Sequence, residues 1–253
     1  MTVREIYRFL DEKIPRALSC AWDNDGLMCC PNGDREVRRV LVTLDVTAEA
    51  VKVAIEGGYD VIVSHHPMIF KGLKAINEEN YIADKAMALI RAGVAVMSFH
   101  TRLDAVGGGV NDTLAALLGL ADVESFGEEG IGRIGTLRGE EALTDFAERV
   151  KMLLGAPAVA VADGKKTVHR VAVLGGAGGD DVAAAQAAGA DTYLSGTLGY
   201  HDLVDAPENG MNLVAAGHYY TEAPICAVLC AWIAEADKTI ICDTYRSANV
   251  AVI

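Results

Sequence analysis

The 253-residue chain has no apolar run approaching the roughly 18–20 residues that a membrane-spanning helix needs. Its first fifteen residues carry charges throughout and lack the apolar core of a secretory signal peptide. No run of lysine or arginine occurs, and the formal net charge is −13. An acidic chain without a basic patch repels phosphate backbones. These absences argue against a membrane protein, a secreted protein and a nucleic-acid-binding protein, and we expect a cytoplasmic protein.

The cysteines form no C-x-x-C pair, so the usual spacing of a redox or zinc site is missing. They are Cys20, Cys29, Cys30, Cys226, Cys230 and Cys242. In a reducing cytoplasm we expect free thiols, and buried inert side chains are the simplest interpretation. Cys226 and Cys230 stand at i and i+4, which would place both on one face of a helix.

What the chain has in abundance is small and apolar: 51% of the residues are hydrophobic and 26 are glycine. Strand-like segments at 37–46, 60–64 and 94–99 alternate with helical patterns at 47–58 and 80–92. This β-α-β-α-β order predicts a parallel or mostly parallel sheet with helices on its faces. The composition and the pattern both indicate a layered α/β fold.

The second half of the chain repeats the first at a shift of 131 residues. VRRVLV (37–42) falls on VHRVAV (168–173), and nine of the 28 positions from 37 to 64 are then identical. The match includes a strand start and a strand end without a gap. It predicts two similar three-layer α/β/α halves. We expect a first domain of residues 1–124 with 218–253 and a second domain of residues 125–217.

Four of the six histidines lie just after predicted strands. Each is accompanied by another histidine or by an acidic residue, and the last two pairs share the spacing H-x-x-x-acid-Ala. The pairs are His65 with His66, His100 with Asp104, and His218 with Glu222. Ligands of open α/β sheets bind beyond the carboxyl ends of the strands, so we expect the three pairs to lie close together.

Imidazole nitrogens and carboxylate oxygens are the usual protein ligands of Zn, Mn, Fe and Co. Adjacent residues on an extended backbone point to opposite sides, so His65 and His66 are expected to serve two neighbouring ions. Asp104 or Glu222 could bridge the ions, and two ions about 3.5–4 Å apart can activate a bridging water for hydrolysis. Taken singly, each motif is better explained by a hydrogen-bonded turn. Together, at three equivalent strand ends, they favour a metal site.

Other motifs are less specific. GGAGGD (175–180) follows a strand and fits a phosphate cradle at a helix N-terminus and a tight strand-to-helix turn about equally well. Asn111 or Asp112 is placed to cap the helix that follows. His201 comes after a strand of the second half and is a further candidate to line the cleft. His169 stands at a strand start, so we expect a structural role for it.

Three motifs in this order, SHHP (64–67), FHTRLDAVGGGVND (99–112) and GHYYTE (217–222), resemble the Nif-three-like dinuclear metal centre proteins. Members of that family are also described as GTP cyclohydrolase type 2 homologues. AWDNDGL (21–27) and YLSGTLGYHDLVDA (193–206) support the resemblance, which covers nearly the full chain.

The resemblance implies two divalent ions per chain, of Zn, Fe, Mn or Co, in a cleft between the halves, and a toroidal homohexamer. It also implies a metal-dependent hydrolase for a small molecule such as GTP, another nucleotide or a phosphoester. His100 matches a further family histidine close to the metals. The metal ligands fall on His65, His66, Asp104, His218 and Glu222. The alternative is a non-catalytic ring that binds a protein partner or nucleic acid.

Two positions depart from the family pattern. Arg102 stands where the family often has asparagine, which adds a cation beside Asp104 in the sequence. Thr197 stands where the family often has an acidic residue. We expect these changes to alter substrate contacts and to leave the implied ligands intact.

Overall fold

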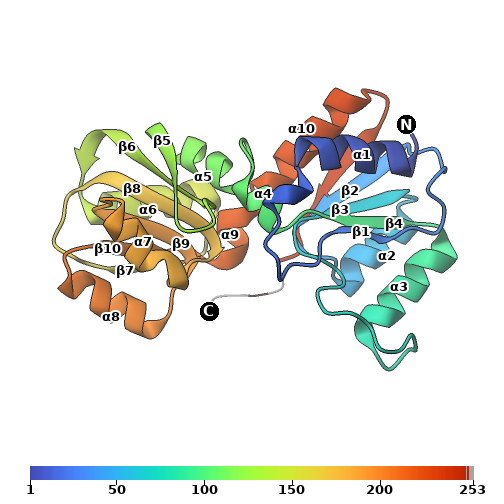
Figure 1. The fold of residues 1–253 in the computed structure, drawn as a ribbon, viewed down its shortest axis with the longest axis horizontal. Helices are drawn as coiled ribbons and strands as arrows, with labels where there is room; N and C mark the ends of the chain where they lie inside the picture. Colours follow the sequence, from blue (N-terminus) through green and yellow to red (C-terminus); the bar gives the residue numbers. More distant parts are fainter. Residues whose placement is uncertain (249, 251–253) are drawn as a thin grey trace. The chain divides into compact units, whose positions relative to one another are not determined.

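The computed structural model describes residues 1–248 and 250, and it is an α/β protein with two sheets (Figure 1). By its contacts the chain forms two compact units. Unit 1 is built on Met1–Leu103 and the segment that starts at Cys226, and unit 2 is built on Asp104–Ile225. The domain limits expected from the sequence stay a prediction. No helix in the described part of the chain is long and apolar enough to cross a membrane.

The sheet of unit 1 has the strand order β1-β4-β3-β2-β11. Strands β2, β3, β4 and β11 pair in parallel, and only β1 pairs antiparallel, with β4. The mostly parallel sheet predicted from the sequence is therefore confirmed. The strands are β1 (Gly26–Cys29), β2 (Arg39–Thr43), β3 (Val61–Ser64), β4 (Ala95–Ser98) and β11 (Ile241–Tyr245).

Helices cover both faces of this sheet: α2 and α3 lie on one side, and α1 and α10 lie on the other (Figure 1). Leu41, Ile62 and Val96 project from successive strands into one hydrophobic cluster with Val51 of α2 and Leu89 of α3. Strand residues alternate between faces, so their buried neighbours form the second core layer. The helices are α1 (Val3–Lys13), α2 (Ala48–Glu56), α3 (Tyr81–Ala92) and α10 (Ile225–Ala236).

The sheet of unit 2 has the strand order β5-β6-β8-β9-β10-β7, with β8, β9 and β10 parallel to one another. Its strands are β5 (Ala121–Phe126), β6 (Gly132–Glu141), β7 (Ala160–Ala162), β8 (Val168–Ala177), β9 (Thr192–Thr197) and β10 (Asn212–Ala215). Its longer helices are α5 (Val110–Leu118), α6 (Leu143–Leu154), α7 (Val182–Ala187) and α8 (Tyr200–Glu208). Short helices α4 (Thr101–Ala105) and α9 (His218–Glu222) follow strands β4 and β10.

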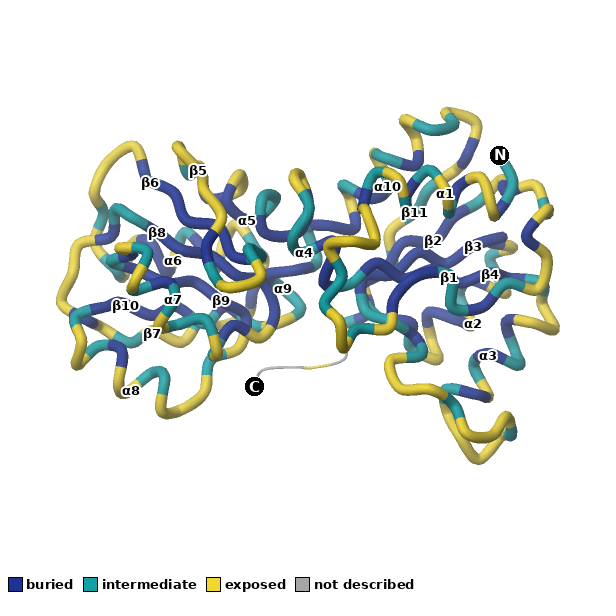
Figure 2. The backbone as a smooth tube through the Cα atoms, viewed as in Figure 1, coloured by how far each residue is buried: buried dark blue, intermediate teal, exposed yellow. Residues whose placement is uncertain are grey.

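Strand β8 shows why unit 2 also has three layers. Val171 and Val173 pack with α5 and α6 in one hydrophobic cluster. Ala172 and Leu174, which alternate with them, pack with α7 and α8 in another. A strand that is apolar on both faces needs cover on both faces. In Figure 2 the central strands of both sheets are accordingly buried, and exposed residues lie on the helices and loops around them.

The internal repeat is present in the register of the strands. Val40 pairs with Val61 in unit 1, and Val171 pairs with Thr192 in unit 2, each 131 residues further along. Asp60 and Asp191, which directly precede β3 and β9, make equivalent hydrogen bonds in the two units. Asp60 accepts hydrogen bonds from the backbone nitrogens of residues 38 and 39, and Asp191 from those of 169 and 170. The fold prediction of two similar halves is confirmed.

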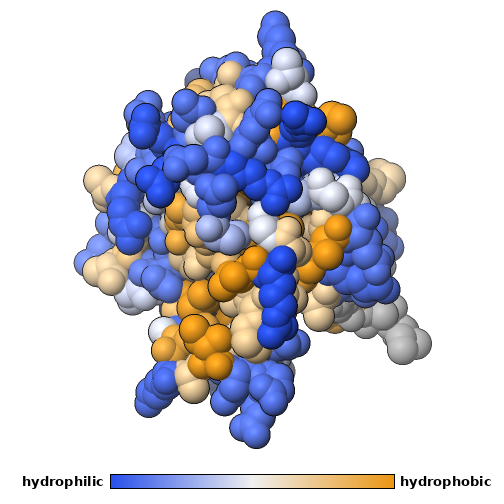
Figure 3. Space-filling model, turned by 90° about the vertical axis from the view of Figure 1, so that its right-hand side faces the viewer, coloured by the Kyte–Doolittle hydropathy of each residue, from blue (hydrophilic) through white to orange (hydrophobic). Residues whose placement is uncertain are grey.

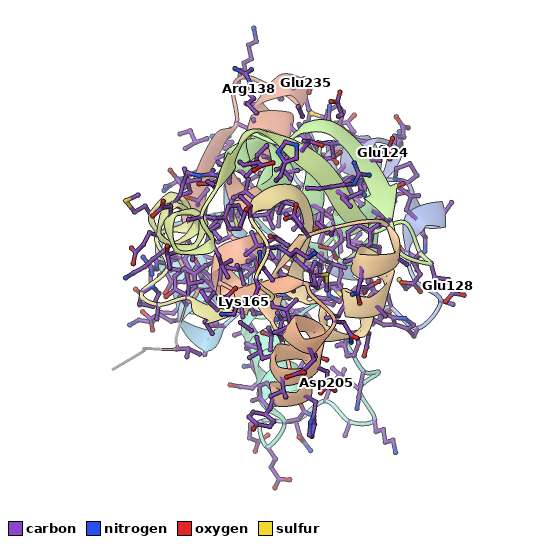
Figure 4. All side chains as sticks on the ribbon, turned by 90° about the vertical axis from the view of Figure 1, so that its left-hand side faces the viewer. Glu124, Glu128, Arg138, Lys165, Asp205 and Glu235 are labelled. Atoms are coloured by element: carbon purple, nitrogen blue, oxygen red, sulfur yellow. A yellow bond between two sulfur atoms is a disulfide. The ribbon has the colours of Figure 1, made fainter. Side chains whose placement is uncertain are left out.

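The surface of unit 1 mixes hydrophilic and hydrophobic groups, with a hydrophobic band across the view in Figure 3. In Figure 4 the labelled charged side chains project outward, among them Glu124, Glu128 and Asp205 of unit 2. All three residues are exposed. These exposed carboxylates contribute to the net charge of −13 and are solvated.

The cysteines differ from the expectation at one pair. Cys230 of α10 and Cys242 of β11 form a disulfide with a Cα–Cα distance of 5.5 Å. The expectation that all the thiols are reduced is wrong for these two residues. Sequence spacing misses the pair because helix and strand packing brings it together. Cys29 and Cys226 are buried thiols, as expected.

Arg102 lies inside unit 1 and not on a substrate-facing surface. Its guanidinium is fully buried, and it contacts Asp25 at 2.7 Å and Asp11 at 2.6 Å. It also donates to the Ile14 carbonyl at 2.8 Å and lies over the Phe99 ring. The substitution that distinguishes this chain from the family pattern is therefore part of a buried ion network that ties α1 to the start of α4.

We predict that Arg102→Ala lowers the free energy of unfolding by about 3–5 kcal/mol, because it leaves the buried Asp25 carboxylate without its cation. Arg38→Ala is the matched control, since Arg38 forms an exposed ion pair with Glu36. Its loss should change the same quantity by no more than about 0.5 kcal/mol. Urea unfolding followed by circular dichroism measures both, and equal losses would contradict this role of Arg102.

Candidate metal centre

The carboxyl ends of the central strands of unit 1 are aligned. Thr43 of β2 pairs with Ser64 of β3, and Ser64 pairs with Ser98 of β4. The Ser64 and Ser98 hydroxyl groups are 2.8 Å apart and buried. This common register places the residues that follow each strand at one edge of the sheet, as the sequence predicted.

His65 and His66 come directly after β3, where the backbone bends. The Ser64 hydroxyl donates to the His66 carbonyl at 2.8 Å and holds this bend. The two imidazole rings lie with centroids 4.9 Å apart and planes tilted by 40°. The expectation that they point to opposite sides is wrong, because the strand ends at Ser64 and the extended alternation ends with it.

Each of these histidines is oriented through its Nδ1 atom. His65 Nδ1 lies 2.9 Å from the Phe99 carbonyl oxygen, and His66 Nδ1 lies 2.7 Å from Asp45 Oδ1. A carbonyl or a carboxylate can only accept, so Nδ1 carries the proton and the Nε2 lone pair faces away from these partners. This arrangement is typical of metal-binding histidines, whose second nitrogen donates to a carbonyl or carboxylate.

His100 is held in the same way from another direction. Its Nδ1 atom lies 2.9 Å from Oδ1 of Asp23, a carboxylate with no exposed side-chain surface. The other oxygen of Asp23 accepts from the backbone nitrogen and the hydroxyl of Thr101. Burial would raise the pKa of Asp23, but these hydrogen bonds hold it at about 2. Asp23 is therefore an anion that fixes the His100 ring.

The three rings form one cluster in unit 1. The His100 centroid is 5.3 Å from that of His65 and 5.6 Å from that of His66. One ligand nitrogen from each ring lies within 4.8 Å of the others. Three imidazoles whose Nδ1 atoms already have acceptors fit a divalent ion of the Zn, Fe, Mn or Co type.

Unit 2 presents a second group of ligand-type residues. His218 and Glu222 occupy positions i and i+4 of the short helix α9, and His218 Nε2 lies 3.2 Å from Glu222 Oε2. Glu222 is 4% exposed, unlike the solvated acidic residues of the surface. Asp104, in α4, places a carboxylate oxygen within 4.8 Å of one from Glu222. His218 and Asp104 each lie near Glu222, and imidazole nitrogen and carboxylate oxygen are donor types that bind divalent ions.

Glycines in β8 and β9 allow helix α9 to pack closely against these two strands. Gly176 of β8 has a φ of 73°, and a Cβ atom there would overlap Glu222 Oε1. A Cβ atom at Gly196 of β9 would approach the Gly176 carbonyl oxygen to 2.5 Å and the Thr221 hydroxyl to 2.6 Å. Thr221 in turn accepts from the Gly176 backbone nitrogen at 3.0 Å. The first glycines of GGAGGD thus make space for the carboxylate, a role that neither interpretation of the motif included.

The remaining candidates lie elsewhere. Helix α5 begins after Gly109, so neither Asn111 nor Asp112 caps it. Asn111 is fully buried and donates to the Asp104 carbonyl, while its own oxygen accepts from the Gly175 nitrogen. His201 is exposed on α8, beside the Tyr200 ring, and is not part of the metal-type clusters found among the described residues.

Sequence reasoning missed Asp23 and Asp45, which orient His100 and His66. Asp45 follows β2 in the register of the histidine pair, so the strand-end argument could have found it. Asp23 lies in a loop, and the one signal in the sequence that could have indicated it is its place in the motif AWDNDGL. A contact across 77 residues has no local signal.

The fold and these clusters define an α/β protein with residues that could hold metal ions. The family model for Duf34/NIF3 (NGG1p interacting factor 3) matches residues 1–247. The chain belongs to the Duf34/NIF3 family, which confirms the resemblance found in the sequence.

Relatives match over most of their length. A Clostridium perfringens protein named GTP cyclohydrolase 1 type 2 homolog is 33% identical over 236 residues, which cover 89% of this chain and 88% of the relative. The crystal structure of Staphylococcus aureus protein SA1388 has a TM-score of 0.90 at 26% identity and covers 100% of this chain and 99% of its own. Reduced HcgD from Methanocaldococcus jannaschii has a TM-score of 0.85 at 28% identity, with 96% and 97% covered.

We predict that Gly176→Ala destabilises unit 2 by more than the roughly 1–2 kcal/mol that a left-handed alanine costs, because its Cβ overlaps Glu222. Gly119→Ala is the matched control, with a φ of 72° and no atom within 4 Å of the new Cβ. Thermal unfolding of both variants measures the difference. The excess should shrink in Gly176→Ala combined with Glu222→Ala, and an unchanged excess would exclude this overlap as its cause.

Proposed function

We propose that this protein is a dinuclear metal-dependent hydrolase. The observation that carries the proposal is the common orientation of His65, His66 and His100, whose Nδ1 atoms all lie within 3 Å of a carbonyl or carboxylate oxygen. A buried histidine in a merely structural role needs one such partner and no neighbouring imidazoles. Three together, each with Nε2 directed away from its partner, form a set of oriented imidazoles in which His65 and His66 can bind metal and His100 lies beside them.

The proposed ligands of the two ions are His65, His66, Asp104, His218 and Glu222. Their positions along the chain support this set. The chain leaves unit 1 after Leu103, directly before Asp104, and it returns at Cys226, shortly after Glu222. The ligands of unit 2 therefore stand in the two segments that connect it to unit 1. Helix α4 runs through the first of these connections.

When bound, such ions would polarise the substrate and lower the pKa of a water molecule, which is the chemistry of metal-dependent hydrolysis. The residues of the chain would set its geometry. Asp45 and the Phe99 carbonyl hold His66 and His65 in orientation. Asp23 holds His100, which is the candidate to exchange a proton at Nε2 with the substrate or the leaving group.

The names of the relatives and the chemistry of the site support this substrate class. GTP, another nucleotide or a phosphoester would each offer an electrophilic phosphorus or ring carbon to an activated water molecule. The curated relatives are named for GTP cyclohydrolase. We also propose that the chain assembles as a homohexamer, which size-exclusion chromatography with light scattering would test.

We predict that His65→Ala and Glu222→Ala lower the bound metal per chain, because each removes a proposed ligand. Asp45→Ala keeps every ligand and should weaken metal binding by about 10–100-fold, since it frees the His66 ring. His201→Ala is the control and should bind metal like the unaltered protein. Elemental analysis after dialysis measures all four. Fewer than about one ion per chain in the unaltered protein would contradict a dinuclear site.

We predict that the metal-loaded protein hydrolyses at least one member of a panel of GTP, cyclic nucleotides, phosphoesters and small amides. Glu222→Ala should lose at least about 100-fold in kcat/KM, because an ion that is missing or displaced no longer activates water. His201→Ala should retain full activity. Hydrolysis that Glu222→Ala leaves unchanged would exclude catalysis at this centre and favour a binding or scaffold role.

A further inference from the structure

Two large aromatic side chains beside the histidine cluster are exposed. Trp22 is 61% exposed and Phe70 is 41% exposed, although phenylalanine, tryptophan and tyrosine together make up only 6% of the chain. Their ring centroids are 6.2 Å apart, and each lies 6.2 Å from the centroid of His100. The pair thus adjoins the cluster, and all three residues belong to unit 1.

The backbone around Trp22 is anchored on both sides. The Cys20 nitrogen donates to the Thr101 hydroxyl at 3.0 Å, and Asp23 binds His100 and Thr101. Asn24 Nδ2 donates to the carbonyl of Ile69, directly before Phe70, at 2.5 Å. One set of contacts therefore orients His100 and presents both aromatic rings. Exposed rings on an anchored loop are pre-organised for binding.

The geometry of the rings favours a flat partner. Trp22, Phe70 and His100 meet edge to face, with interplanar angles of 69°, 78° and 87°. Contacts of this kind do not use parallel stacking, so a planar ring can still stack on Trp22 or Phe70. Stacking of a nucleobase on an aromatic side chain is favourable and tolerant of the base, because every base has a π-face.

We propose that Trp22 and Phe70 bind a planar conjugated ring of the substrate and direct it toward His100. The ligand class is a heteroaromatic ring such as a nucleobase. The proposal rests on the proposed function, because it supplies the substrate of the same centre. It selects ring-bearing compounds over phosphoesters or amides without a ring.

Tryptophan fluorescence tests the ring site directly, since the chain has only Trp22 and Trp232. Trp232→Phe leaves Trp22 as the single reporter. The probes are guanosine, adenosine, cytidine and neopterin, with glycerol 2-phosphate as the ring-free control. At least one ring compound should quench Trp22 emission, and glycerol 2-phosphate should not. Quenching by none of the ring compounds would overturn the proposal.

Variants distinguish ring binding at Trp22 and Phe70 from an effect of removing any exposed aromatic side chain. Trp22→Ala and Phe70→Leu should each weaken binding of the quenching ring compound, followed by calorimetry, by about tenfold or more. Trp22→Phe should restore most of the loss. Tyr81→Ala is the control, because Tyr81 is 74% exposed and starts helix α3. Equal weakening by Tyr81→Ala would overturn the assignment.

Metal content, measured on the same samples, distinguishes this proposal from the proposed function. Trp22→Ala should retain the full metal content and show a raised KM for a ring-bearing substrate. A protein that binds no metal but whose Trp22 is quenched by a ring would contradict the hydrolase and keep the ring site. Full metal content with an unchanged KM in Trp22→Ala would overturn the ring site alone. Dissociation of an oligomer by Trp22→Ala, without loss of ring binding, would assign Trp22 to a contact between chains.

Discussion

The common register of β2, β3 and β4 is the constraint on which the rest of unit 1 depends. Parallel pairing ends all three strands at one edge, at Thr43, Ser64 and Ser98. Asp45, His65, His66 and His100 then follow within two residues of these strand ends. Phe99 directly follows β4 and His65 directly follows the neighbouring strand β3. The register therefore lets the Phe99 carbonyl accept a hydrogen bond from His65. Strand pairing thus sets both the positions and the orientations of the imidazoles.

Much of this was accessible from the sequence because it depends on local patterns. Apolar runs of four or five residues specify buried parallel strands, and the repeat at 131 residues reappears as equal register in both sheets. The positions of His65, His66 and His100 at strand ends follow from the same patterns. The direction of the His65 and His66 side chains was predicted wrongly. The backbone bends after Ser64, so the alternation of an extended strand ends there and the two rings lie close together.

The parts that could not be predicted depend on contacts far apart in the chain. Asp23 reaches His100 across 77 residues, and Cys230 meets Cys242 through the packing of a helix on a strand. Arg102 was expected near a substrate because it stands beside Asp104 in the sequence. Residues two apart on a helix differ in direction by about 200°, so the Arg102 side chain enters the core of unit 1 instead.

The close approach of α9 to β8 has a consequence for related chains. At Gly176 the space of a single methyl group is already occupied by the Glu222 carboxylate. In a relative with this fold, a side chain at that position must therefore displace the carboxylate from the place that Glu222 has here. The position of the Glu222 carboxylate thus depends on the absence of a side chain at Gly176. In a member of the family without this glycine, we therefore expect the carboxylate to take another position even where the histidines are present.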